Sequence, residues 1–130
     1  MTPVLLDTCA LIWWTSDTGK LSEKALEACN RIKISGAAIS SISIWEIGMK
    51  IKNKKIDMGC SISELVNKLY EIDKFEIVPV DEITWLQNLS LEWDHRDPAD
   101  RTIVATAKLR NLPIITKDPL IRNFYPKTIW

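Results

Sequence analysis

Four carboxylic acids, far apart in the sequence, occupy positions from which a single site could be built. Asp7 and Asp118 each follow a short apolar run, whereas Glu46 and Asp100 each lie just inside a predicted helix. Two carboxylates about 4 Å apart repel by roughly 4 kcal/mol at an effective dielectric constant near 20. If the fold gathers these side chains, the cluster therefore requires a cation, and all four are candidate catalytic and metal-binding residues.

Two helix-start signals each place one of these acids in the first turn of a helix. The dipeptide Asp97-Pro98 predicts an N-cap followed by the first helical residue, which puts Asp100 at the third helical position. Ser43 and Glu46 match a capping box, which predicts the same third position for Glu46. The alternative is that the acids only cap their helices, or that Glu46 pairs with the lysine one turn later.

The order of the predicted elements indicates how the acids could meet. Short apolar runs predict strands near residues 4–6, 37–40, 75–80, 112–116 and 128–130. Periodicity and capping signals predict helices over about residues 22–31, 43–54, 61–74, 81–92, 97–111 and 119–124. This alternation indicates one α/β domain over residues 1–130, with a mostly parallel sheet of four to five strands covered on both faces. In such a sheet the four acids are expected at the edge where the strands end and the returning helices begin.

The donor types favour Mg²⁺ or Mn²⁺ as the cation. No other ligand type is expected to join the acids, because Cys9, Cys29 and Cys60 show no paired spacing and His95 is the single histidine. We expect His95 at the surface or in a supporting role. Carboxylate oxygens suit hard cations that keep several waters, and such ions activate water and stabilise charge developing on a phosphoryl group.

The overall composition excludes several classes of protein. The formal net charge is +0, so no overall field indicates nucleic-acid or membrane binding. The N-terminus lacks the basic and apolar regions of a signal peptide, and no apolar run approaches about 18 residues. We therefore expect a cytoplasmic protein with reduced thiols that is neither exported nor embedded in a membrane.

Basic residues nevertheless surround the acids in the sequence. Residues 96–127 hold seven Lys and Arg against three Asp, and residues 48–60 hold four Lys against one Asp. They are expected to hold a nucleic-acid backbone beside the acids, unless they form only a solvated helix face. The candidate nucleic-acid contacts are Lys50, Lys52, Arg96 and Arg101, and the candidate auxiliary residues of the site are Asp97, Thr8 and Thr116.

Four short motifs together resemble the PIN-domain family, and within it the VapC-like toxins of bacterial type II toxin–antitoxin pairs. They are Leu5-Leu6-Asp7-Thr8, Ser43-Ile44-Trp45-Glu46-Ile47, the stretch from His95 to Ala107, and Ile115-Thr116-Lys117-Asp118. The resemblance spans essentially the whole chain and implies a PIN-like three-layer α/β/α sandwich. It also implies a Mg²⁺- or Mn²⁺-dependent endoribonuclease whose acidic quartet is Asp7, Glu46, Asp100 and Asp118. One departure is Ala99, where many such toxins have a large aromatic residue.

The resemblance further implies an RNA substrate and a cognate antitoxin, and we also expect a homodimer. The adjacent Trp13 and Trp14 cannot both face inward, so one of them is expected on a partner surface. Two other functions remain open. One is a housekeeping RNA-processing nuclease without an antitoxin. The other is a phosphoacceptor receiver module, which is disfavoured because Asp7 is followed by Thr8 rather than by a second acid.

Overall fold

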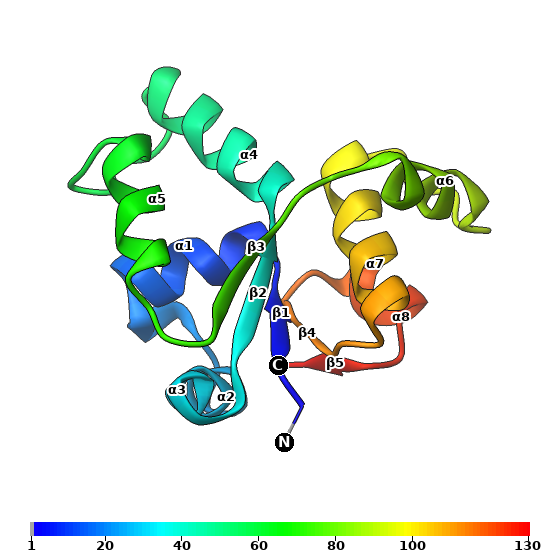
Figure 1. Ribbon diagram of the computed structural model, residues 1–130, viewed down its shortest axis with the longest axis horizontal. Helices are drawn as coiled ribbons and strands as arrows, with labels where there is room; N and C mark the ends of the chain where they lie inside the picture. The colour runs from blue at the N-terminus through cyan, green and yellow to red at the C-terminus, as the bar shows by residue number, and fades with distance from the viewer. Residues whose placement is uncertain (1) are drawn as a thin grey trace.

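The computed structural model describes residues 2–130, in which five strands form one parallel sheet (Figure 1). The order across the sheet is β3-β2-β1-β4-β5. Leu5 in the central strand pairs with Ala38 on one side and with Ile114 on the other. All four strand pairs are parallel, so the predicted parallel sheet is confirmed. The strands are β1 (Val4–Leu6), β2 (Ala37–Ser40), β3 (Phe75–Val78), β4 (Ile114–Ile115) and β5 (Thr128–Ile129).

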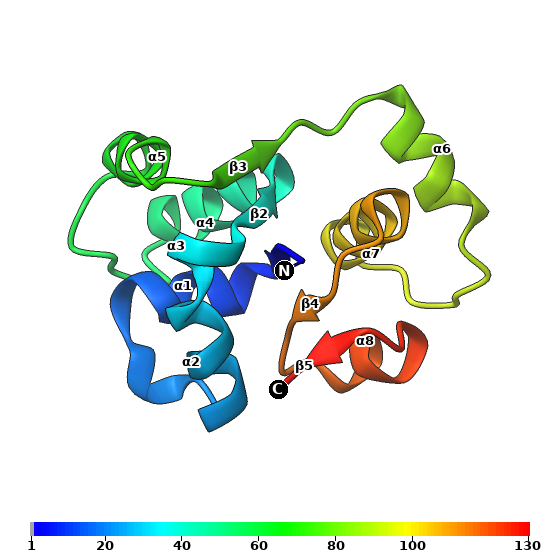
Figure 2. The same cartoon turned by 60° about the horizontal axis from the view of Figure 1, so that its bottom comes forward.

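Helices cover both faces of the sheet, as both views show (Figures 1 and 2). One layer consists of α1 (Thr8–Ser16), α2 (Glu23–Asn30), α3 (Ile32–Ser35), α4 (Ser41–Lys52) and α5 (Ile62–Tyr70), with a short 3-10 helix, η1 (Thr18–Lys20). The opposite layer consists of α6 (Glu82–Ser90), α7 (Pro98–Arg110) and α8 (Pro119–Phe124). The structure therefore has the three-layer α/β/α arrangement that the sequence predicts.

Alternation of side chains along the central strand divides the hydrophobic core in two. Leu6 packs with the apolar faces of α1, α2, α4 and α5, whereas Leu5 packs with α7 and α8. Successive side chains of a strand point to opposite faces, so each of the two leucines belongs to a different core. Both are fully buried, as expected for the central strand of a sheet covered on both sides.

Local capping chemistry fixes where several helices begin. The side chain of Asp97 accepts hydrogen bonds from the backbone N–H groups of Ala99 and Asp100, and Pro98 is the first residue of α7. The predicted capping box of Ser61 and Glu64 is present, with both of its reciprocal bonds at 3.1 Å. Both signals act within four residues of the helix start, and in these two helices the predicted bonds form.

The predicted start of α4 is wrong. Ser40, the last residue of β2, caps this helix through a bond from the Ile42 N–H, and helical structure begins at Ser41. Ser43 is therefore already inside the helix, and Glu46 lies in its second turn rather than at the third position. Two helices also end earlier than predicted: α5 ends at Tyr70, and α6 ends at Ser90.

In the part of the chain that the structure describes, no helix is both long and apolar enough to cross a bilayer.

Candidate active site

A cleft of about 430 Å³ opens at the end of the sheet where the strands finish. All four acids predicted for the site contribute to its lining, and a fifth acid joins them. The five are Asp7, Glu46, Asp97, Asp100 and Asp118. They come from the ends of β1 and β4, from α4 and from the start of α7. The fold therefore brings together residues as far apart in the sequence as Asp7 and Asp118, which are separated by 111 positions.

Asp7 is the most deeply buried of these acids, with 5% of its surface exposed. It caps α1 by accepting a hydrogen bond of 2.8 Å from the Ala10 N–H, and it also accepts one from the Thr116 hydroxyl. Burial raises the pKa of its carboxyl group from 3.8 to about 6, because the charged form loses its hydration. The neighbouring carboxylates of Asp100 and Asp118 raise this pKa further, whereas the two hydrogen bonds lower it.

Asp100 lies in the first turn of α7, as predicted, and its Oδ2 is 2.8 Å from Nε2 of His95. Burial raises the pKa of Asp100 to about 6, and the hydrogen bond from His95 opposes this increase. The expectation that no histidine joins the acids is therefore wrong. The bond agrees with the expected supporting role of His95, although sequence spacing does not show how the segment before α7 folds back over the helix start.

Glu46 is held by a threonine on a different helix. The hydroxyl of Thr8, in the first turn of α1, donates a hydrogen bond to Oε1 of Glu46. Thr8 Oγ1 also lies 2.9 Å from Oγ of Ser43, which is fully buried one turn before Glu46 on α4. Thr8 was a predicted auxiliary residue, and Ser43 was interpreted only as a helix cap.

Thr116 connects the two acids that follow β1 and β4. Its hydroxyl donates to Asp7 and accepts a hydrogen bond of 3.0 Å from the Asp118 N–H. Asp118 in turn caps α8 by accepting a bond from the Leu120 N–H through Oδ1, as the Asp-Pro signal predicts. Thr116 is fully buried, so this link lies under the floor of the cleft.

Two lysines face the acids from the wall of the cleft. Lys50 and Lys117 both line it, and Nζ of Lys117 lies 6.0 Å from the centroid of the Trp13 ring, which also lines it. Lys50 was a predicted nucleic-acid contact, whereas Lys117 was not. Two of the other three predicted contacts, Lys52 and Arg96, are exposed outside this lining.

Arg101, a predicted nucleic-acid contact, forms its hydrogen bonds within the chain. Its guanidinium group donates hydrogen bonds to the backbone carbonyl groups of Asn88, Leu91, Trp93 and His95, and to the side chain of Asn88. These bonds tie the connection between α6 and α7 to the start of α7. With its donors directed at the chain itself, the guanidinium group is not presented to a phosphate in the cleft.

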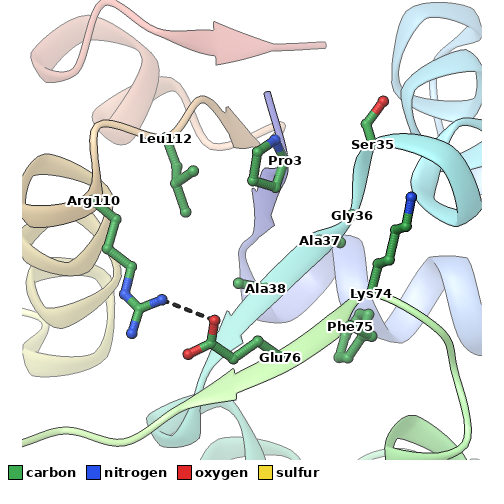
Figure 3. Close-up of a pocket in the computed structure, with 10 residues that line it drawn as sticks. All are labelled: Pro3, Ser35, Gly36, Ala37, Ala38, Lys74, Phe75, Glu76, Arg110 and Leu112. Atoms are coloured by element: carbon green, nitrogen blue, oxygen red, sulfur yellow. Dashed lines mark hydrogen bonds and ion pairs between the residues drawn. The ribbon is translucent and has the colours of Figure 1, made fainter. Parts of the chain in front are cut away.

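A second and larger hollow, of about 650 Å³, lies at the opposite end of the strands (Figure 3). Its charged groups already have partners: Arg110 forms an ion pair with Glu76 at 2.9 Å, and Lys74 donates to the Ile34 carbonyl. Its remaining lining is mostly apolar or backbone, as the residues drawn around Pro3 and Phe75 show. The chemistry of the protein is therefore expected at the acidic cleft.

The donor set of the acidic cleft fits a divalent cation. Burial is the main cause of the raised pKa values of Asp7 and Asp100, and the neighbouring carboxylates raise both further, so a bound cation would favour the charged forms. Oxygen ligands from a few carboxylates are what Mg²⁺ and Mn²⁺ take in proteins. Asp7, Glu46, Asp100 and Asp118 all line this cleft, so their carboxylate groups are the oxygen donors that it offers to such an ion.

Fold and site together define an α/β/α protein with an acidic cleft at the carboxyl ends of a parallel sheet. The chain belongs to the PIN domain family, whose model matches residues 4–125. It is 29% identical to Ribonuclease VapC22 from Mycobacterium tuberculosis (strain ATCC 25618 / H37Rv), and the match covers 100% of both chains. It also resembles a chain of a toxin–antitoxin complex from Klebsiella pneumoniae, with a TM-score of 0.67 at 22% identity, over 98% of this chain and 96% of that one. The resemblance deduced from the four sequence motifs is confirmed.

Proposed function

We propose that this protein is a metal-dependent endoribonuclease and the toxin of a toxin–antitoxin pair. The observation that carries the proposal is the convergence of Asp7, Glu46, Asp100 and Asp118 in one cleft that also presents two lysines. The similarity to Ribonuclease VapC22 supports RNA as the substrate. A bound Mg²⁺ or Mn²⁺ would supply an activated water and would stabilise the charge that develops on the phosphodiester.

The chain's own residues divide the work of the site between them. Asp7 follows β1, Asp118 follows β4 and Asp100 lies in α7, and these three carboxylates would hold one or two metal ions, directly or through water. Glu46, whose carboxylate accepts a hydrogen bond from Thr8, would orient the metal or its water. Lys50 and Lys117 offer positive charge to the phosphates of RNA beside the reacting group.

A partner that covers the cleft is part of the proposal. An unrestrained ribonuclease in the cytoplasm, where we place the protein, would degrade RNA that the cell needs. One of the similar solved structures is a toxin–antitoxin complex, which supports an antitoxin as the partner. The expected homodimer stays a prediction.

The test is cleavage of RNA by the purified protein with Mg²⁺, with Mn²⁺ and with excess EDTA. We expect cleavage only with a metal ion, and a loss of several orders of magnitude in rate for Asp7→Asn and Asp100→Asn while circular dichroism stays unchanged. Asp94→Asn is the matched control, because Asp94 is exposed outside the cleft lining and its loss removes the same charge. Equal cleavage in EDTA would refute the metal dependence, and an Asp7→Asn protein as active as the wild type would refute the site.

A further inference from the structure

His95, Asp97 and Asp100 form a compact group at the edge of the acidic cleft. Each offers one ligand atom, and the three atoms all lie within 4.8 Å of one another. Asp97 and Asp100 line the cleft itself, and the side chains of His95 and Asp100 are 18% and 19% exposed. Small solutes can therefore reach the group, although it is largely shielded by the protein.

The spacing of these atoms matches the spacing of ligands around a metal ion. Adjacent ligands of an octahedral ion with bonds of about 2.1 Å are about 3 Å apart. His95 Nε2 and Asp100 Oδ2 are 2.8 Å apart. An ion shared by the two groups would replace this hydrogen bond at nearly the same separation of nitrogen and oxygen, and the proton between them would be released to solvent.

The imidazole ring is held in place by its surroundings. It packs against Trp93 at 4.8 Å between ring centroids, and Trp93 stacks on Phe124 of α8 at 4.5 Å with the two planes 6° apart. The backbone carbonyl of His95 accepts a hydrogen bond of 3.0 Å from Arg101. A ligand fixed in this way loses little conformational freedom when a metal binds, which favours binding.

Nitrogen and oxygen ligands discriminate between the two candidate ions. Mg²⁺ is a hard cation that prefers oxygen ligands, whereas imidazole nitrogen suits transition ions. An all-carboxylate centre is therefore a poor discriminator between Mg²⁺ and Mn²⁺, and one imidazole in the ligand set shifts the preference toward Mn²⁺.

We propose, on the basis of the metal-dependent activity proposed above, that a metal ion at this edge of the cleft is bound by His95 together with Asp97 and Asp100, Asp100 being the residue shared with the other acids of the cleft. The nitrogen of His95 makes the centre select Mn²⁺ over Mg²⁺. His95 then has two roles: it positions Asp100 through their hydrogen bond, and it determines which ion the site binds.

The chain is well suited to a direct test because His95 is its single histidine. Electron spin-echo spectroscopy of Mn²⁺ bound to the tag-free protein detects magnetic coupling to a coordinated ¹⁴N nucleus. An imidazole nitrogen signal can then arise only from His95. We expect this signal in the wild type and its absence in His95→Gln, whose side-chain amide can still donate a hydrogen bond to Asp100.

Affinities measured by calorimetry without RNA provide the second readout. We expect His95→Gln to weaken Mn²⁺ binding at least about tenfold more than Mg²⁺ binding, on the scale typical of changes at metal sites. Asp94→Asn, which removes a nearby exposed charge, should leave the ratio of the two affinities unchanged.

Two outcomes would overturn the assignment of His95 while leaving the proposed ribonuclease intact. One is Mn²⁺ that binds the wild type without nitrogen coupling. The other is an equal loss of Mn²⁺ and Mg²⁺ affinity in His95→Gln, which would mean that His95 only positions Asp100. A wild-type protein that binds neither ion, by contrast, would contradict both this assignment and the metal dependence of the proposed function.

Discussion

The hydroxyl of Thr8 donates a hydrogen bond to the carboxylate of Glu46, a residue 38 positions later in the chain. Thr8 opens α1 directly after Asp7, and Glu46 lies on α4, so the bond joins the two helices on one side of the cleft. The buried hydroxyl of Ser43 completes the contact at 2.9 Å from Thr8. The orientation of Glu46 therefore depends on two hydroxyl groups rather than on helix capping.

This relationship predicts that Thr8→Val slows RNA cleavage. Valine has nearly the same shape but no hydroxyl, so it frees the carboxylate of Glu46 and leaves Ser43 without its partner. We expect a 10- to 100-fold lower single-turnover rate, roughly the effect of removing a group that orients a metal ligand. Thr8→Ser, which keeps the hydroxyl, is the control. Equal rates for the valine and serine variants would show that Glu46 does not need this bond.

Crowding of the carboxylates predicts that Asp100→Asn stabilises the metal-free protein. Asparagine removes one charge from beside Asp7 and Asp118, and its amide oxygen can still accept the bond from His95. We expect a higher melting temperature in EDTA for Asp100→Asn, and a larger stabilising effect of Mg²⁺ on the wild type than on the variant.

Differential scanning calorimetry with and without Mg²⁺ measures both effects, with Asp94→Asn as the control. If Asp100→Asn instead destabilises the metal-free protein by about 1 kcal/mol or more, the favourable interaction of Asp100 with the start of α7 outweighs the repulsion.

The raised pKa of Asp7 predicts a pH dependence of stability in the absence of metal. The folded protein holds the proton of Asp7 up to about pH 6, whereas the unfolded chain releases it near pH 3.8. The contribution of Asp7 to the free energy of unfolding is therefore fully present below pH 3.8, and this contribution is lost as the pH rises through about 6. A difference of this size corresponds to about 3 kcal/mol.

Urea unfolding in EDTA between pH 3.5 and 7 tests this dependence against Asp7→Asn, because asparagine can keep the cap of α1 but does not titrate. We expect the wild type to lose stability relative to the variant over this range. A constant difference between the two proteins would mean that burial does not hold Asp7 protonated.

The bonds of Arg101 predict a structural role that the sequence did not suggest. Arg101→Met should lower the free energy of unfolding by about 3 kcal/mol, because several carbonyl groups lose a charged donor. Arg96→Met, which changes an exposed neighbour, should stay within about 0.5 kcal/mol of the wild type. Urea unfolding of both variants provides the comparison. If Arg101→Met is as stable as the wild type but binds RNA more weakly, the original prediction of a nucleic-acid contact was correct.

Local signals predicted much of the fold, and tertiary contacts decided the rest. The Asp-Pro dipeptides at 97 and 118 identified two helix starts because their capping bonds span only two or three residues. The start of α4 could not be read in this way. Ser40, Ser41 and Ser43 are all acceptable caps by type, and the choice follows from the end of β2 and from the contact between Ser43 and Thr8.

The gathering of the acids was predictable from topology, whereas the place of His95 was not. Strand ends and helix starts meet at one edge of any parallel sheet covered by helices, so four positions sufficed to predict the cleft. His95 reaches Asp100 because the irregular segment before α7 is fixed by Arg101 and by the stacking of Trp93 on Phe124. No periodic pattern encodes such a segment.

Trp13 is the residue of the adjacent tryptophan pair that the structure places at the cleft. Its ring packs 5.7 Å from that of Trp130 and lies near Lys117, whereas Trp14 stacks on Phe75 away from the acids. The cleft thus combines an apolar wall with excess negative charge, which suits a partner segment that carries an arginine among hydrophobic residues. A guanidinium group binds carboxylates bidentately and would occupy the space that metal or RNA requires.

Antitoxin binding is therefore expected to depend on Trp13 and to compete with Mg²⁺. Trp13→Ala should weaken binding of the cognate antitoxin more than Trp14→Ala does, because only the first of these rings lines the cleft. Affinity measured by calorimetry should fall as Mg²⁺ rises, and by more than in monovalent salt of the same ionic strength, because competition for the same acids adds to screening. An affinity that follows ionic strength alone, with equal effects of the two tryptophan variants, would place the antitoxin on another surface of the protein.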